Sequence, residues 1–340
     1  MEAYITSVKD LVLEALSNFP AIKASSGKSN VQASFKMGMI YLLGINTQAD
    51  YKNAAKHFSQ HELADNKESN CILGFIAECM GDFSLAFQQY AKANSDEKSS
   101  YLNKVTKGRN YLQDYLKRLG LPVFQNKELD NILVDYAKGN ASKIGASIKL
   151  ATICNDEMTC LEAAQCYFFA KDYISAVKWL QKGHVAFDNS MYSAINKKFE
   201  ESRKSLLNAD EITVIDLEGC SLLDSEDATP FLNKVKKSCE EASMKASVEW
   251  KDKVKNLINV IVKEQKEKER LEQLEFEAKE AARKRKRNLI IKHSVACLVL
   301  FILGTTNDQA DNWFVGGISM IIGAYFWFYL IRWIWKKMKK

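Results

Sequence analysis

Few side chains in this sequence have the type and spacing that catalysis or metal binding requires. His57 and His61 stand four residues apart, with Glu62 beside them, so two imidazoles would share one helix face and could hold a metal ion. The same residues fall at the end of a predicted helix, where polar side chains are common. We favour this second interpretation and expect no metal and no cofactor.

The cysteines are a second potential source of chemistry. Cys154, Cys160 and Cys166 are spaced six apart, which matches neither a CxxC zinc site nor a single helix face. Disulfides are the alternative, but the chain is long and its cysteines lie in apolar helical patterns, so we expect buried free thiols in a reducing compartment. The eight cysteines are Cys71, Cys79, Cys154, Cys160, Cys166, Cys220, Cys239 and Cys297.

Sequence motifs of common enzyme classes are missing. The chain contains no GxGxxG or GxxxxGK[ST] phosphate loop, no GxSxG elbow and no HExxH pair. We therefore do not expect an enzyme, and an unfamiliar active site on the helices described below is retained only as a third hypothesis.

Composition identifies the class of fold that must position any functional residue. The 340 residues are 47% hydrophobic and 26% charged, which is enough apolar material for a core and excludes a disordered chain. Only 3 prolines and 15 glycines are present, which argues against collagen-like and turn-dense β architectures. A net charge of +6 is too small to predict nucleic-acid binding. The expected fold is all-α.

Residues 33–61 contain a pattern of small and aromatic residues that punctuates two helices joined by a glycine-containing turn. The pattern consists of Ala33, Met37, Gly38, Tyr41, Gly44, Asp50, Tyr51, Ala54 and Phe58. It resembles a Sel-one-like repeat, the longer-turned relative of the tetratricopeptide repeat. Gly38 and Ala54 would let the two helices approach, while Tyr41 and Phe58 fill the space between neighbouring hairpins.

Two further units follow, at 69–93 and 160–183, and they resemble the tetratricopeptide pattern. Aligning Asp82 with Asp172 also superposes Phe83 on Tyr173 and Ala86 on Ala176. The repeat-defining residues of these units are Gly74, Gly81, Ala86, Asp172 and Ala176. The resemblance implies a solenoid of helical hairpins over residues 1–207, with degenerate hairpins between the second and third units.

A connector and a long helix are predicted to follow the solenoid. The connector, 208–229, is acidic, and its apolar run ITVIDL fits a strand, a helix or an extended segment equally well. From Pro230 to residue 287 the pattern predicts one long helix with an apolar stripe near Trp250 and many charged residues beyond it. We interpret its charged part as a solvated helical stalk, with dimerisation as a coiled coil as the alternative.

The last part of the sequence, 288–335, predicts two transmembrane helices. The runs 288–306 and 313–331 would each span about 28 Å as helices. Lys292 interrupts the first run, so one span preceded by a re-entrant segment is the alternative. Basic residues flank the pair, and 336–340 form a basic tail. The membrane-flanking residues are Arg283, Lys284, Arg285, Lys286, Arg287, Lys336 and Lys337.

These flanks lead to a functional hypothesis. Positive-inside logic predicts an integral membrane protein with two spans and with both its N-terminal domain and C-terminus in the cytoplasm. The cluster at Arg283–Arg287 would then face anionic headgroups of the lipid bilayer, rather than serve as a nuclear localisation or nucleic-acid patch. We expect a membrane-anchored adaptor that recruits a protein or peptide partner through its solenoid. The alternative is a subunit of a membrane complex or pore, and a homo-oligomer could form through stalk or hairpin.

Overall fold

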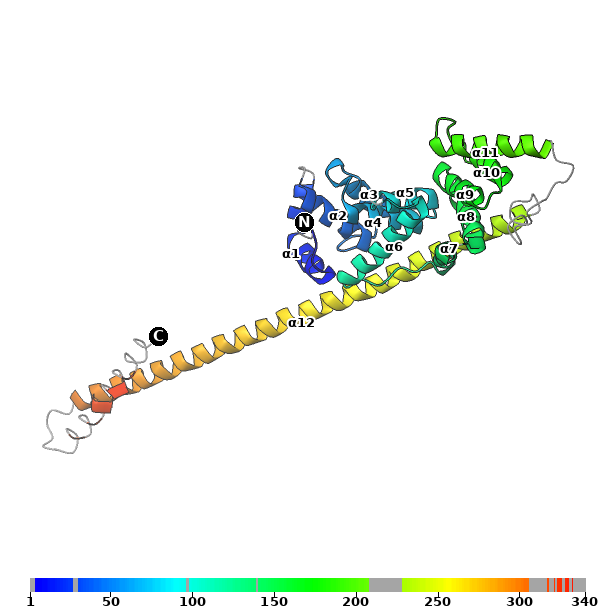
Figure 1. Cartoon of the computed structure of the whole chain (residues 1–340). Helices are drawn as coiled ribbons and strands as arrows, with labels where there is room; N and C mark the ends of the chain where they lie inside the picture. Colours follow the sequence, from blue (N-terminus) through cyan, green and yellow to red (C-terminus); the bar gives the residue numbers. More distant parts are fainter. Residues whose placement is uncertain are drawn as a thin grey trace. The chain divides into compact units, whose positions relative to one another are not determined.

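The structure is a computed structural model that describes residues 4–26, 30–95, 98–138, 140–207 and 228–305, together with 317, 321, 323–325, 328–329 and 332. Regular secondary structure in these residues is entirely helical (Figure 1), which confirms the all-α prediction. The helices are α1 (Val8–Ser26), α2 (Val31–Leu43), α3 (Tyr51–Phe58), the short 3₁₀ helix η1 (His61–Leu63), α4 (Lys67–Cys79), α5 (Phe83–Lys92), α6 (Tyr101–Arg118), α7 (Lys127–Lys138), α8 (Asn140–Cys154), α9 (Glu157–Phe169), α10 (Tyr173–Lys182), α11 (Ser190–Leu207) and α12 (Thr229–Thr305).

Neighbouring helices in the sequence are also neighbours in space. α2 packs on α3, α4 on α5 and α9 on α10, and these pairs coincide with the three two-helix units predicted from the sequence. Contacts between α1 and α2, α5 and α6, α7 and α8, α8 and α9, and α10 and α11 join the pairs into a continuous series. We refer to α1–α11 as the helical stack.

An aspartate starts the second helix of each of these three pairs. Asp50 accepts a hydrogen bond from the backbone N–H of Asn53 at 2.9 Å, and Asp82 and Asp172 make the equivalent bond three residues on, at 3.0 Å each. An N-cap of this kind satisfies one of the free N–H groups of the first helical turn and is worth about 1 kcal/mol. The recurring aspartate therefore fixes where each second helix begins.

Glycine in the first helix of a pair makes room for an aromatic ring from the second. A Cβ atom added to Gly38 would lie 2.7 Å from the Phe58 ring, and one added to Gly74 would lie 2.7 Å from the Tyr90 ring. Both distances are too short for two carbon atoms, so a larger residue would force the helices apart. The glycines allow each ring to lie directly on the partner backbone.

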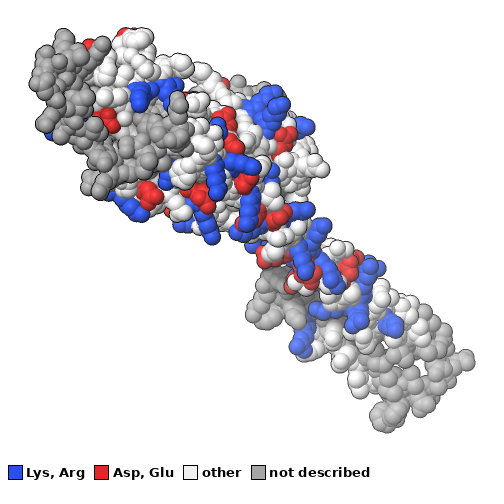
Figure 2. Space-filling view, turned by 90° about the vertical axis from the view of Figure 1, so that its right-hand side faces the viewer, with Lys and Arg blue, Asp and Glu red and all other residues white. Residues whose placement is uncertain are grey.

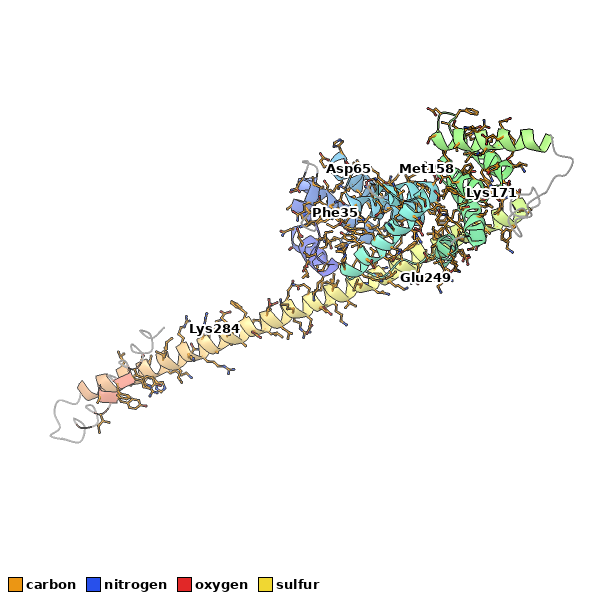
Figure 3. The ribbon with its side chains drawn as sticks, in the orientation of Figure 1. Phe35, Asp65, Met158, Lys171, Glu249 and Lys284 are labelled. Atoms are coloured by element: carbon orange, nitrogen blue, oxygen red, sulfur yellow. The ribbon has the colours of Figure 1, made fainter. Side chains whose placement is uncertain are left out.

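The turns of the second and third pairs share a left-handed backbone position. Gly81 has a φ of +78°, and Lys171, which occupies the equivalent position before Asp172, has a φ of +67°. Glycine adopts this conformation without cost, whereas a residue with a Cβ is strained there by about 1–2 kcal/mol. The third pair thus keeps the turn geometry of the second without its glycine. Lys171 is labelled in Figure 3.

This difference gives a prediction for the exposed Lys171. Lys171→Gly is expected to raise the free energy of unfolding by about 1 kcal/mol, because relief of the left-handed strain outweighs the extra chain entropy of glycine. Urea denaturation followed by circular dichroism measures the change. The converse substitution, Gly81→Ala, serves as the matched control and should lower stability by a similar amount, since no atom lies within 4 Å of the added Cβ and only the backbone is strained. Equal stability of Lys171→Gly and the parent chain would contradict the prediction.

The chain divides into two compact units, residues 1–263 and 264–340. The first contains the helical stack together with residues 229–263 of α12, which we call the docked segment. The described side chains of α12 beyond it are almost all exposed, and ion pairs one helical turn apart join Lys279 to Glu275 at 3.4 Å and Lys284 to Glu280 at 3.3 Å. Exposed pairs of this kind contribute only a few tenths of a kcal/mol each.

The prediction of two transmembrane helices, and with it an integral membrane protein, is corrected by the structure. Within the part of the chain that the structure describes, no helix is both long enough and apolar enough to cross a membrane. The first predicted run, 288–306, starts inside α12, where the exposed Lys292 and His293 follow the basic residues 283–287 on the same helix. Most of the second run, 313–331, and all of the tail 336–340 lie outside the described residues, as does 208–227 of the acidic connector.

Candidate functional site

His57 and His61, the two histidines of the predicted pair, lie on two different helices of the structure. His57 lies at the end of α3, where its ring stacks on Tyr41 with centroids 5.6 Å apart, and His61 opens the short helix η1. Burial, with a smaller contribution from Lys56, lowers the pKa of His57. Among the described residues, no group of three or more His, Cys, Asp or Glu side chains is placed to hold a metal ion.

The cysteines that the structure describes in full are buried free thiols. These are Cys71, Cys79, Cys154, Cys160, Cys166 and Cys239. Burial raises the pKa of Cys71 and of Cys79 to about 12, well above the ordinary range for a thiol. Because the thiolate is the reactive form, these two residues are unreactive at neutral pH and act as small apolar core residues.

The raised thiol pKa values predict a loss of stability in alkali. An unfolded thiol ionises near pH 9, whereas Cys71 stays protonated in the fold up to pH of about 12. The contribution of Cys71 to the free energy of unfolding is therefore complete below pH 9. It is lost as the pH rises from 9 to 12, by about 1.4 kcal/mol per pH unit for each such thiol. Urea denaturation at pH 8 and at pH 10.5 should show the decline. In Cys71→Ala the free energy of unfolding should fall less steeply with pH, because one ionising thiol is removed. An unchanged slope in that variant would show that Cys71 does not have a raised pKa in the fold.

A buried ionic network, which the sequence did not reveal, links four successive helices. Arg109 of α6 donates from Nε and Nη2 to the two carboxylate oxygens of Glu78 in α4, at 3.0 and 2.7 Å, and from Nη1 to Asp130 of α7. Tyr90 of α5 donates its hydroxyl proton to Glu78 Oε2 at 3.0 Å. The Glu78 side chain is 0% exposed and that of Arg109 is 7% exposed. These charges satisfy one another inside the stack, so their role is to hold the helices together.

The clearest binding surface of the stack is the one that holds the docked segment of α12. Its main anchor is Trp250, which is 2% exposed and packs edge-to-face on Phe75 of α4 with ring centroids 4.8 Å apart. Phe75 in turn packs edge-to-face on Phe124, with ring centroids 4.9 Å apart. The indole Nε1–H of Trp250 donates to the backbone carbonyl of Pro122 at 2.8 Å. The anchor thus combines a large buried apolar surface with a satisfied polar group.

Polar contacts fix the docked segment on either side of this anchor. Asn126, which caps the first turn of α7 by accepting from the N–H of Leu129, donates its amide to Ser243 Oγ at 2.7 Å. The hydroxyls of Tyr51 and Ser247 lie 3.2 Å apart and share a hydrogen bond. Each contact joins α12 to a different part of the stack, so the register of the helix on the stack is specified along its length.

The docked segment runs from the later helices of the stack toward the earlier ones. Its first turns place Phe231 near Lys149 of α8. The segment next meets Asn126, at the start of α7, and then Phe75 of α4. The last part of the segment lies beside the turn between α2 and α3. One continuous surface of the stack therefore binds one amphipathic helix across several hairpins, a common mode of helix recognition.

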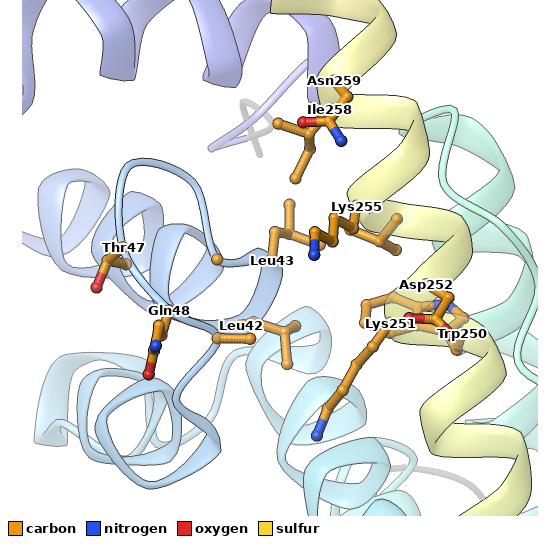
Figure 4. Close-up of a pocket in the computed structure, with 13 residues that line it drawn as sticks. Leu42, Leu43, Thr47, Gln48, Trp250, Lys251, Asp252, Lys255, Ile258 and Asn259 are labelled. Atoms are coloured by element: carbon orange, nitrogen blue, oxygen red, sulfur yellow. The ribbon is translucent and has the colours of Figure 1, made fainter.

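A cleft of about 350 Å³ lies where the docked segment passes this turn (Figure 4). Its volume is at the lower end of the range for ligand sites. Both apolar and charged side chains line it, and Figure 4 shows them projecting from the two sides. The lining comprises Leu42, Leu43, Gly44, Thr47, Gln48 and Ala49 from the α2–α3 side, with Trp250, Lys251, Asp252, Val254, Lys255, Ile258 and Asn259 from α12.

The residues that we expected to define the repeats lie in the interior of the hairpins or at their turns. Ala54, Ala86 and Ala176 are each 0% exposed. Gly44 ends α2 in the left-handed conformation, and Tyr41 is half-buried against His57. The remaining repeat-defining residues are the glycines and aspartates described above. All of them shape the hairpins, and the structure places none of them in the cleft except Gly44.

The basic residues at 283–287 occupy a different part of the chain. Arg283, Lys284, Arg285, Lys286 and Arg287 are exposed on α12 in the unit 264–340, whereas Lys336 and Lys337 lie outside the described residues. On the face of the molecule shown in Figure 2, lysine and arginine alternate with aspartate and glutamate over much of the surface.

Comparison with known proteins adds no identification. No family model, no curated protein and no solved structure matches this chain. The interpretation of its function accordingly depends on the geometry described above.

Proposed function

We propose that this chain is a helical-repeat scaffold of the tetratricopeptide or Sel-one-like kind, and that its function is to bind a segment of a partner protein. The observation that carries the proposal is the docked segment of α12. The stack holds this amphipathic helix across several hairpins through an aromatic anchor and specific polar contacts. A surface built to recognise one protein segment has the chemistry to recognise others.

The arrangement of ionisable groups supports binding more than catalysis. The buried carboxylate of Glu78 is neutralised by Arg109, and that of Glu162 accepts a hydrogen bond from Tyr136. Both pairs lie between helices, where they stabilise packing. Large apolar side chains are exposed instead at the end of α9, where Phe169 is 75% exposed, and after α10, where Phe187 is 81% exposed. Exposed aromatic residues of this size are common anchors in protein interfaces.

Resemblance to the Sel-one-like and tetratricopeptide repeats rests on three hairpins with the same construction. Each has an aspartate N-cap and a fully buried alanine in its second helix. The first two also place a glycine beneath an aromatic ring. Repeats of this construction form extended surfaces for partners, and that general property is what we extend to this chain.

Site-specific photo-crosslinking tests the proposal. Benzoylphenylalanine would replace Gln48, Phe169 or Phe187 on the stack, or the exposed Lys268 on α12 as a matched control outside it. We expect at least one stack position to give a discrete adduct in the cells that make the protein, and the Lys268 position to give none. The captured protein would then be identified by mass spectrometry, purified and shown to bind the purified chain with micromolar or tighter affinity. Absence of any discrete adduct from all three stack positions would overturn the proposal.

A further inference from the structure

The turn between α2 and α3 differs from the turns of the other two repeat pairs. It comprises residues 44–50, whereas α4 and α5 are separated by 80–82 and α9 and α10 by 170–172. The extra residues project beside the docked segment and form one wall of the cleft (Figure 4). The cleft is therefore a feature of the first hairpin that the shorter turns cannot reproduce.

This turn is held in place by contacts along its length. Asn46 adopts a positive φ of 55° and donates its amide to the backbone carbonyl of Ala15 in α1 at 2.8 Å. The N–H of Asp50 donates to the carbonyl of Tyr41 at 2.8 Å, and Ile45 is 1% exposed. Thr47 and Gln48, by contrast, are exposed on the cleft side. A fixed backbone that presents free polar side chains is preorganised to bind a ligand.

The opposite wall, from α12, carries a net positive charge. Lys251 and Lys255 are exposed, one helical turn apart, and both line the cleft. Lys251 Nζ lies 4.1 Å from the centre of the Tyr51 ring, a cation–π contact that orients its ammonium group. Among the described residues that line the cleft, Asp252 is the only acid. No ion pair to a carboxylate is formed by either lysine within the described part of the chain.

The floor between these walls is apolar. Leu42, Leu43 and Val254 are buried beneath the opening, and Ile258 is partly exposed at its edge. Such a floor favours an aliphatic side chain, while the lysines above it favour carboxylates on either side of that chain. The exposed amide of Gln48 can pair with a peptide backbone. The cleft thus offers complementary groups for an apolar residue flanked by acids.

We propose that this cleft binds a short acidic peptide segment of a partner protein, in which a leucine or isoleucine is flanked by aspartate or glutamate. This inference rests on the proposed scaffold function and specifies the partner's chemistry. The leucine or isoleucine packs on Leu42, Leu43 and Ile258. The flanking carboxylates pair with Lys251 and Lys255, which gives the interaction both specificity and a dependence on ionic strength.

Fluorescence polarisation with the full chain tests the proposal directly. The probe is a fluorescein-labelled pool of acetylated hexapeptides, each with a central leucine or isoleucine between two acidic residues. A matched pool replaces every aspartate by asparagine and every glutamate by glutamine. We expect the acidic pool to bind at least tenfold more tightly than the neutral pool and to weaken severalfold between 50 and 300 mM salt, about the range over which screening changes markedly.

Lys255→Glu and Lys253→Glu provide the matched variants. Both residues are exposed on the same helix and both substitutions change the net charge equally, but only Lys255 lines the cleft. Lys255→Glu should weaken binding of the acidic pool at least tenfold, and Lys253→Glu should change it less than twofold. Thermal melting of both variants checks that the fold is intact.

Three results would overturn the proposal: no binding of the acidic pool at millimolar peptide, equal binding of the neutral pool, or equal weakening by the two substitutions. The last would indicate nonspecific attraction to the charged helix. If any of these occurs while photo-crosslinking still captures a partner on the stack, the scaffold function stands and only the cleft's specificity is wrong. If crosslinking also fails, both are wrong.

Discussion

Trp250→Ala is expected to lower the free energy of unfolding by about 4 kcal/mol and to release the docked segment from the helical stack. The indole is 2% exposed, so truncation leaves a large cavity against Phe75 and removes the donor to the carbonyl of Pro122. Loss of a buried tryptophan side chain typically costs about 3–5 kcal/mol. Urea denaturation measures the energy, and hydrogen exchange measures the release as loss of protection at the amides of residues 239–261.

Two further substitutions separate the contributions of packing and hydrogen bonding. Trp250→Phe retains a ring against Phe75 but leaves the Pro122 carbonyl without its donor, so a smaller loss of about 1–2 kcal/mol is expected. Val248→Ala is the control on the same helix, because Val248 is 59% exposed, and it should change stability by less than about 0.5 kcal/mol. A loss below about 1 kcal/mol for Trp250→Ala would show that α12 does not depend on this anchor.

The region around Trp250 also shows which part of the docking of α12 could be predicted from the sequence. The apolar stripe around Trp250 predicts that this part of the long helix docks on something, and the structure places it on the helical stack. The surface that receives it could not be predicted, because it is assembled from Pro122, Phe75 and Tyr51, which are far apart in the sequence. Helical periodicity identifies the face that is buried but carries no information about its partner.

Features within a single hairpin were easier to identify from the sequence. The repeated aspartate and glycine positions were recognised at fixed spacing, but their roles as N-caps and beneath aromatic rings came from the structure. Tyr41 and Phe58, which were expected to fill the space between neighbouring hairpins, contact His57 and Gly38 within their own hairpin. Lys171 shows the limit of this approach, because only the alignment with Gly81 suggests that its backbone is left-handed. The cleft was missed for a different reason, since its two walls come from residues 44–49 and 250–259.

The prediction of two transmembrane helices is contradicted within the residues that the structure describes, where no helix is both long enough and apolar enough to cross a membrane. The prediction took the basic residues 283–287 as the flank of a first membrane span, whereas the structure continues one helix from Thr229 through these residues to Thr305; most of the second predicted run lies outside the described residues. Lys292 and His293 remain exposed within that helix. The charged residues 283–287 that were interpreted as membrane flanks are thus exposed residues of a continuous helix.

Arg109→Met is expected to have the second large effect on stability, a loss of about 3–5 kcal/mol. The substitution leaves the carboxylate of Glu78 buried at 0% exposure without its counter-ion, and only the hydroxyl of Tyr90 still donates to it. Removal of one member of a buried ion pair is far more damaging than removal of both, because an uncompensated charge stays in a medium of low dielectric constant. Chemical denaturation at pH 7 measures the loss.

A double substitution distinguishes the buried charge from simple loss of packing. Arg109→Met combined with Glu78→Gln removes both charges while Tyr90 retains an acceptor, so about 2 kcal/mol of the loss should be recovered. Lys117→Met is the matched control, because Lys117 lies on the same helix but is 61% exposed, and it should cost less than about 0.5 kcal/mol. If the double variant is no more stable than Arg109→Met, the arginine contributes through its packing between α4 and α7 rather than through neutralisation of Glu78.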